Sequence, residues 1–144
     1  MSTVGRPVVA QSCRGTLLPV PALDLVDETF LVVPPAAVAA VFAEPANWPR
    51  FWPDLTLAVY ADRGDEGLRW TVAGALVGTQ EVWLEPMLDG TLLHYFLRAD
   101  PPVPFRGQKQ RLRALRQRQH AAKAVALDLK AELEQGREPG LPPR

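Results

Sequence analysis

Few side chains in this sequence combine a reactive type with a position suited to chemistry. The only serines are Ser2 and Ser12, and the only cysteine is Cys13, all within an aperiodic N-terminal segment. A nucleophile there has no neighbouring base, so we do not expect serine or cysteine catalysis. The two histidines, His94 and His120, have no His or Cys companions at metal-ligand spacing. We therefore predict no catalytic residue, no metal site and no cofactor.

A group of apolar side chains is the better candidate for a site. Its members are expected to point toward a C-terminal helix and are Trp52, Trp70, Val72, Val82, Leu84, Leu93, Tyr95 and Leu97. The Tyr95 hydroxyl in such a wall could bind a ligand carbonyl and fix its orientation. The same side chains could instead pack only with one another as a core, and the sequence leaves both interpretations open.

Two arginines, Arg111 and Arg118, lie seven residues apart near the edge of the apolar stripe of the expected C-terminal helix. A guanidinium at that edge could hold a ligand carboxylate through two hydrogen bonds at the mouth of a pocket. The alternative is that both side chains extend to acids at the edge of the sheet, such as Glu81 or Glu85.

The composition is that of one globular domain. With 144 residues, 47% of them hydrophobic, the chain is long enough to build a core without disulfides. One cysteine allows no internal disulfide, and no apolar run reaches the roughly 18 residues of a membrane span. We expect a cytoplasmic protein with a flexible arm over residues 1–24, one domain over 25–136 and a disordered tail over 137–144.

The net charge is zero but unevenly distributed. Residues 1–100 carry six basic and twelve acidic side chains, whereas residues 101–144 carry ten basic and four acidic ones. This asymmetry is typical either of a surface for an anionic partner or of a basic helix packed on an acidic sheet. Nucleic acid is the less expected partner, because no exposed aromatic side chains are expected between these arginines for base stacking.

Hydrophobic patterns place the elements along the chain. Glu28–Val33 is rich in β-branched and aromatic residues, which predicts a strand, and Pro34-Pro35 ends it. Residues 36–42 have apolar side chains at helical spacing, and a second short turn is expected over residues 47–52. Alternation predicts four further strands, at about Thr56–Asp62, Leu68–Ala73, Gly78–Glu85 and Leu92–Ala99.

The end of the chain predicts how these strands are covered. Asp89-Gly90 is typical of a tight hairpin, since both residues tolerate a positive φ, and antiparallel pairing is therefore favoured. A long helix with a narrow apolar stripe is expected from about Arg106 to Gln135, with Gly136 as its stop. A sheet of this size cannot bury both faces alone, and a long helix against its concave side solves that problem.

The proline- and tryptophan-rich stretch after the first strand resembles a known family. Residues 34–42 lead into Asn47–Asp54, and Val82–Leu97 forms the last hairpin before the closing helix. Over roughly residues 27–135 this order resembles the START-like (SRPBCC) superfamily, and more narrowly its bacterial polyketide cyclase/dehydrase and lipid transport group. The resemblance implies an α+β helix-grip fold: a curved antiparallel sheet of five to seven strands wrapped around a long C-terminal helix, with two short helices after the first strand.

Three functions follow from these observations. The leading prediction is non-catalytic binding or transport of a small hydrophobic ligand, lipid- or polyketide-like and either neutral or anionic, between the sheet and the C-terminal helix. The alternative is a cyclase or dehydratase, for which Tyr95 with Arg111 or Arg118 is the only candidate set. The third is an interaction protein that uses its basic helix. Trp83 and Phe96 are expected to face away from the helix, which suggests a homodimer contact or cover by the N-terminal arm.

Overall fold

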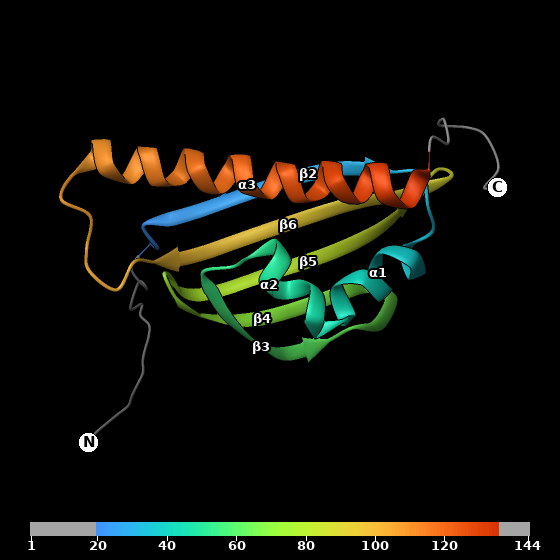
Figure 1. The fold of residues 1–144 in the computed structure, drawn as a ribbon, viewed down its shortest axis with the longest axis horizontal. Coiled ribbons are helices and arrows are strands. Elements are labelled where there is room, and N and C mark those ends of the chain that lie inside the picture. Colours follow the sequence, from blue (N-terminus) through green and yellow to red (C-terminus); the bar gives the residue numbers. More distant parts are fainter. Residues whose placement is uncertain (1–19, 136–144) are drawn as a thin grey trace, which may run out of the picture.

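The protein, seen in a computed structural model, is described over residues 20–135 (Figure 1). Most of the predicted arm (1–19), Gly136 and the predicted tail lie outside the described residues. Within them, five antiparallel strands form one sheet in the order β2-β6-β5-β4-β3. The strands are β2 (Leu23–Leu31), β3 (Leu55–Asp62), β4 (Gly67–Gly74), β5 (Val77–Met87) and β6 (Gly90–Asp100). The helices are α1 (Pro35–Ala43), α2 (Trp48–Phe51) and α3 (Gln108–Glu134), with short 3-10 turns η1 (Pro45–Asn47) and η2 (Gly64–Glu66). The predicted α+β helix-grip is confirmed.

Helices cover the inner face of the curved sheet in two places (Figure 1). α3 runs along β2 and β6, while α1 lies across β4 and β5, and α2 follows it on the same side. The surfaces that meet are apolar: Leu93 and Leu97 of β6 are buried, as are Ala122, Ala126 and Leu129 of α3. One helix cannot cover five strands, so both covers are needed to bury this face.

Side chains of α3 bind the free edge of β2. A strand at the edge of a sheet carries backbone groups without partners, and these must be satisfied. Basic side chains donate to backbone carbonyls along this edge: Arg111 to Ala22 (3.1 Å), Lys123 to Glu28 (2.9 Å) and Lys130 to Phe30 (2.9 Å). Just beyond the strand, the Val32 amide donates to the Glu134 carboxylate at 2.8 Å. Four side chains of α3 therefore fix the helix along β2.

The first strand begins earlier than the sequence pattern predicts. β2 starts at Leu23, within the segment expected to be an arm, and not at Glu28. Leu23 pairs with Ala99 near the far end of β6 and is almost fully buried. The long partner strand and the buried leucines thus extend β2 over a segment whose local sequence does not look like a strand.

The hairpin predicted at Asp89-Gly90 is present, but its residues act differently from the prediction. The positive φ of the turn belongs to Leu88 (52°), and Gly90 has none. Gly90 instead lies so close to β2 that a Cβ atom there would overlap the carbonyl oxygen of Leu31. Glycine is required at this position for close backbone approach.

Candidate functional site

A pocket opens where α2, β6 and α3 come together. Its volume is about 400 Å³, its wall is mostly apolar, and one side is open to solvent. The residues that line it are Phe51, Trp52, Pro53, Asp54, Tyr95, Gln117, Arg118, Ala121 and Ala122. We call this space the mouth pocket. It brings together Trp52, Tyr95 and Arg118 of the predicted site.

Behind the mouth pocket, the space between the sheet and α3 is filled by side chains. A second void there measures only about 10 Å³, enough for at most one water molecule. Trp52, Tyr95 and Ala122 border both spaces and form a partition between them. The other residues around the inner void are Asp27, Phe42, Val82, Leu93, Val125 and Ala126. A ligand of more than a few atoms can reach the interior only if the partition moves.

Trp52 is the central side chain of this partition and is 6% exposed. Its ring centroid lies 5.5 Å from Trp70, 6.0 Å from Tyr95 and 6.2 Å from Phe42. The backbone holds it in place, because its amide donates to the Trp48 carbonyl at 2.8 Å as α2 ends. Each aromatic pair adds about 0.5–1.5 kcal/mol beyond the area that it buries. Trp52 is therefore a firmly held part of the wall that faces the mouth pocket.

The interior behind this wall contains polar groups that are incompletely paired. The Tyr95 hydroxyl donates to Oε1 of the buried Gln80 at 2.8 Å. Gln80 Nε2 and Trp70 Nε1 are buried and have no hydrogen-bond partner within residues 20–135. Burial raises the pKa of Tyr95 well above its ordinary value, so this hydroxyl stays neutral. Gln80 and Trp70 can therefore still donate hydrogen bonds in the interior. Neither they nor the neutral Tyr95 carries a charge.

Arg118 lies at the rim of the mouth pocket and is already bound. Its guanidinium donates to both carboxylate oxygens of Asp54, at 3.1 and 2.7 Å. The partner is Asp54, and neither Glu81 nor Glu85 reaches it: Glu81 pairs with Arg63, and Glu85 contacts His94. A bidentate pair of this kind leaves the rim close to neutral.

The pair of Arg118 and Asp54 predicts how the Asp54 carboxyl group titrates at acid pH. The hydrogen bonds from Arg118 hold the pKa of Asp54 below its ordinary 3.8, although partial burial opposes them. A lowered pKa means that the pair stabilises the fold above pH 3.8 and that this contribution disappears as the pH falls through the folded-state pKa. Carboxyl NMR should give a midpoint for Asp54 below 3.8, and Arg118→Gln should move it upward. Arg111→Gln is the control, and a midpoint that ignores Arg118→Gln would contradict the pairing.

Arg111, the other predicted anchor, lies at a different place. It lines a separate pocket of about 460 Å³ beneath the loop that joins β6 to α3. Besides its bond to the Ala22 carbonyl, its Nε donates to Gln108 at 3.0 Å. The two arginines therefore line separate pockets.

The remaining predicted site residues divide between the void and the core. Val82 and Leu93 border the inner void, whereas the four residues Trp70, Val72, Leu84 and Leu97 are buried and line neither of the two spaces. Phe51, Asp54 and Gln117 line the mouth pocket but were not predicted. The dense Trp48–Pro53 segment was a signal for Phe51, whereas no local pattern pointed to Asp54 or Gln117.

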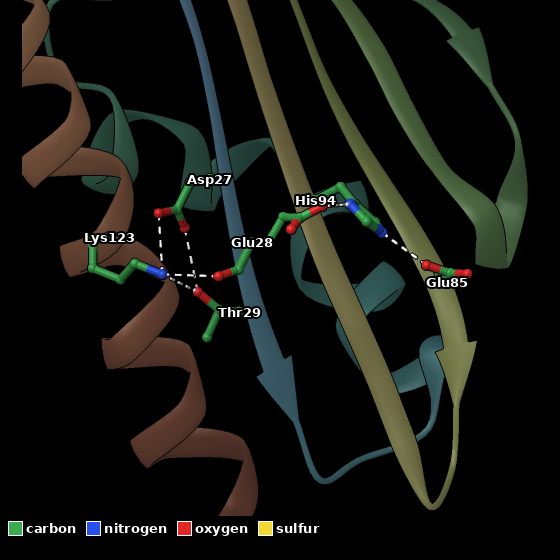
Figure 2. A network of polar contacts seen from close by, with 6 residues as sticks. All are labelled: Asp27, Glu28, Thr29, Glu85, His94 and Lys123. Atoms are coloured by element: carbon green, nitrogen blue, oxygen red, sulfur yellow. Dashed lines mark hydrogen bonds and ion pairs between the residues drawn. The ribbon is translucent and has the colours of Figure 1, made fainter.

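The outer face of the sheet carries a network centred on His94 (Figure 2). Its Nδ1 lies 2.8 Å from Glu28 and its Nε2 lies 3.0 Å from Glu85. The ring stacks between Trp83 and Phe96, with centroids 4.2 and 6.2 Å away. His94 is thus held as a structural group between two carboxylates and two aromatic rings.

The network of Figure 2 continues to α3 around the edge of the sheet. Besides the Glu28 carbonyl, Lys123 Nζ contacts Thr29 Oγ1 at 2.8 Å and Asp27 Oδ1 at 3.1 Å. Lys123 of α3 is thereby linked through Glu28 of β2 to His94 on the outer face.

Neither a family model nor a curated protein sequence matches this chain. Solved structures are similar in fold. A START superfamily protein from Mycobacterium smegmatis is 14% identical, with a TM-score of 0.59, over 76% of this chain and 98% of that one. DR_A0006 from Deinococcus radiodurans is 15% identical, with a TM-score of 0.59, over 78% and 98%. The Aha1 dimer from Colwellia psychrerythraea is 12% identical, with a TM-score of 0.57, over 81% and 99%.

These likenesses concern the fold. In this chain the fold consists of the five-stranded antiparallel sheet, the long α3 and the two short helices after β2. In residues 20–135, no helix is both long and apolar enough to cross a membrane. The chain has a START-like fold of the helix-grip type, as its sequence resemblance predicted.

Proposed function

We propose that this chain binds a small hydrophobic molecule, lipid- or polyketide-like, in the mouth pocket without changing it chemically. The observation that carries the proposal is the apolar pocket of about 400 Å³ backed by Trp52 and Tyr95. Concave, mostly apolar pockets of a few hundred Å³ with few polar groups are typical of small-molecule sites. The single cysteine favours a reducing compartment, which supports the cytoplasm as the place of action.

The ligand that fits best is neutral. Among residues 20–135, Arg118 is the only cation that lines the mouth pocket, and Asp54 already neutralises it through two hydrogen bonds. A carboxylate ligand would have to displace Asp54 from the guanidinium, whereas a neutral ligand leaves the pair intact. Hydroxyl or carbonyl ligands are therefore favoured over fatty acids.

Matched ligands with one chain length test both parts of this proposal. We expect decan-1-ol to bind and decanoate to bind no better, as measured by displacement of the neutral fluorophore N-phenyl-1-naphthylamine. Asp54→Asn frees Arg118 and should raise the affinity for decanoate by about 10-fold or more, with little effect on decan-1-ol.

Two control variants separate the binding function from the preference for a neutral ligand. Asp54→Asn combined with Arg118→Gln should lose the gain for decanoate, and Arg111→Gln should change neither ligand, because Arg111 lines another pocket. Failure of both ligands to bind would refute the binding function. Tight decanoate binding by the unaltered chain would refute only the preference for a neutral ligand.

Cyclase or dehydratase activity has less support. An acid for such a reaction would be Tyr95, but its hydroxyl donates to Gln80, and burial raises its pKa. Arg118 is bound by Asp54, and Arg111 lies elsewhere. Of the three residues that the sequence suggested for catalysis, Tyr95 and Arg118 are already engaged by other side chains, and Arg111 does not line the mouth pocket.

A second copy of this chain is our proposed partner for the outer face of the sheet. Trp83 and Phe96 are only half-buried there, and Val26, which pairs with Phe96 across the strands, is 54% exposed. The Aha1 structure with the same fold is described as a dimer. Sedimentation should show a dimer that Val26→Glu with Phe96→Glu converts to a monomer, and a wild-type monomer at high concentration would contradict this interface.

A further inference from the structure

The basic residues of α3 fall into two sets. Four of them bind groups of the same domain: Arg111, Arg118, Lys123 and Lys130. Lys109, Arg113 and Arg116 are exposed, and within residues 20–135 they make no ion pair or side-chain hydrogen bond. We call these three residues the outer basic stripe.

The stripe occupies one face of the helix. At about 100° per residue, its three members and His120 fall within ~60° of one another. Ala122, Ala126 and Leu129, which bury α3 against the sheet, lie on the opposite side. The stripe therefore points away from the domain that its neighbours on the same helix hold together.

This placement of charge opposes the stability of the helix. The N-terminal end of a helix carries partial positive charge and favours acids, yet the first turn of α3 has none. The acids Asp128, Glu132 and Glu134 all lie in the C-terminal half, where bases are favoured. Lys109 and Arg113 also repel each other as a like-charged pair four residues apart. An external anion would turn these unfavourable charges into favourable ones.

Exposed aliphatic side chains accompany the stripe. Leu112 is 37% exposed. Leu127 lies on the face of the stripe, about two turns beyond His120, and is 50% exposed. Basic side chains with exposed aliphatic groups are typical of surfaces that lie on anionic bilayers. Single-stranded nucleic acid is less suited, because α3 contains no Phe, Tyr or Trp for stacking.

We propose that α3 docks flat on an anionic lipid surface through the outer basic stripe, with Leu127 against the bilayer interface. The mouth pocket lies on the flank of the same helix, since Gln117 and Ala121 line it. Docking would therefore hold the opening of the pocket near the lipid surface. The docking surface does not depend on the ligand that the pocket binds.

Vesicle flotation tests this proposal. The full chain should bind vesicles of phosphatidylcholine with phosphatidylserine, not those of phosphatidylcholine alone, and binding should weaken as salt is raised. Replacing Lys109, Arg113 and Arg116 together by glutamine should weaken binding by about 100-fold, since each base contributes roughly 5-fold near an anionic surface.

A matched variant distinguishes position from net charge. Replacing Arg63, Arg69 and Arg98 of the sheet side by glutamine removes the same charge and should leave binding nearly unchanged. The stripe variant should unfold at the same temperature or higher, because it loses repulsion, so weak binding cannot be ascribed to misfolding. Equal loss in both variants, no binding to anionic vesicles, or binding to RNA instead would overturn the proposal.

Discussion

Trp52→Ala should lower the free energy of unfolding by about 3–5 kcal/mol, the range for removing a large aromatic from a core. The side chain is almost fully buried and contacts four other rings, so its removal leaves a cavity among them. Because Trp52 belongs to the partition, its removal should also join the mouth pocket to the inner void. Urea unfolding measures the first effect, and binding of N-phenyl-1-naphthylamine measures the second.

Trp83→Ala is the matched control for this prediction. Trp83 is only half-buried on the outer face, and its replacement should destabilise the fold less and leave the affinity for the fluorophore unchanged. Equal destabilisation by the two variants would contradict the central role of Trp52. Unchanged fluorophore binding in Trp52→Ala would show that the partition does not separate the two spaces.

Gly90→Ala should destabilise the fold by about 1–3 kcal/mol, because its new methyl group would overlap the backbone carbonyl of Leu31. Both backbones belong to paired strands at the edge of the sheet, and neither can move without disturbing the ladder between β2 and β6. Thermal unfolding followed by circular dichroism would measure the loss.

Leu88→Asn tests the other half of the same turn and should act in the opposite direction. Leu88 has a φ of 52° and a side chain that is almost completely exposed, so nothing is lost when it is replaced. Asparagine tolerates this backbone conformation better, and a gain of about 0.5–1 kcal/mol is expected. A stabilising Gly90→Ala, or a destabilising Leu88→Asn, would mean that the turn has been assigned to the wrong residues.

The fold could be predicted where local patterns decide it. Alternation over residues 92–99 marked a strand because one face of β6 is buried. Alternation over residues 56–62 marked β3, although its inward side chains Leu57 and Ala61 are only half-buried. Helical spacing marked α3 because it packs along one stripe. The start of β2 at Leu23 could not be predicted in this way. It depends on the length of β6, a partner more than sixty residues away in the sequence.

The candidate site was harder to predict from the sequence, because it too depends on contacts between residues far apart in the chain. Trp52 and Tyr95 were predicted because both were expected to point toward the C-terminal helix. The pairing of Arg118 with Asp54 joins residues 64 apart, and no spacing rule connects α3 with the start of β3. Whether the interior is open or filled depends on how Trp52, Phe42 and Tyr95 pack together, which composition does not determine.

A hydrophobic ligand in the mouth pocket would lie beside Trp52 on the inner side of the sheet. The chain has four tryptophans, and their indole N–H signals report on both faces at once. Titration of the ¹⁵N-labelled protein with decan-1-ol should shift the Trp52 signal most and leave that of Trp83 unchanged, with assignments from Trp52→Phe and Trp83→Phe. A shift of Trp83 with Trp52 unmoved, or no shift in any of the four signals, would contradict ligand binding in the mouth pocket.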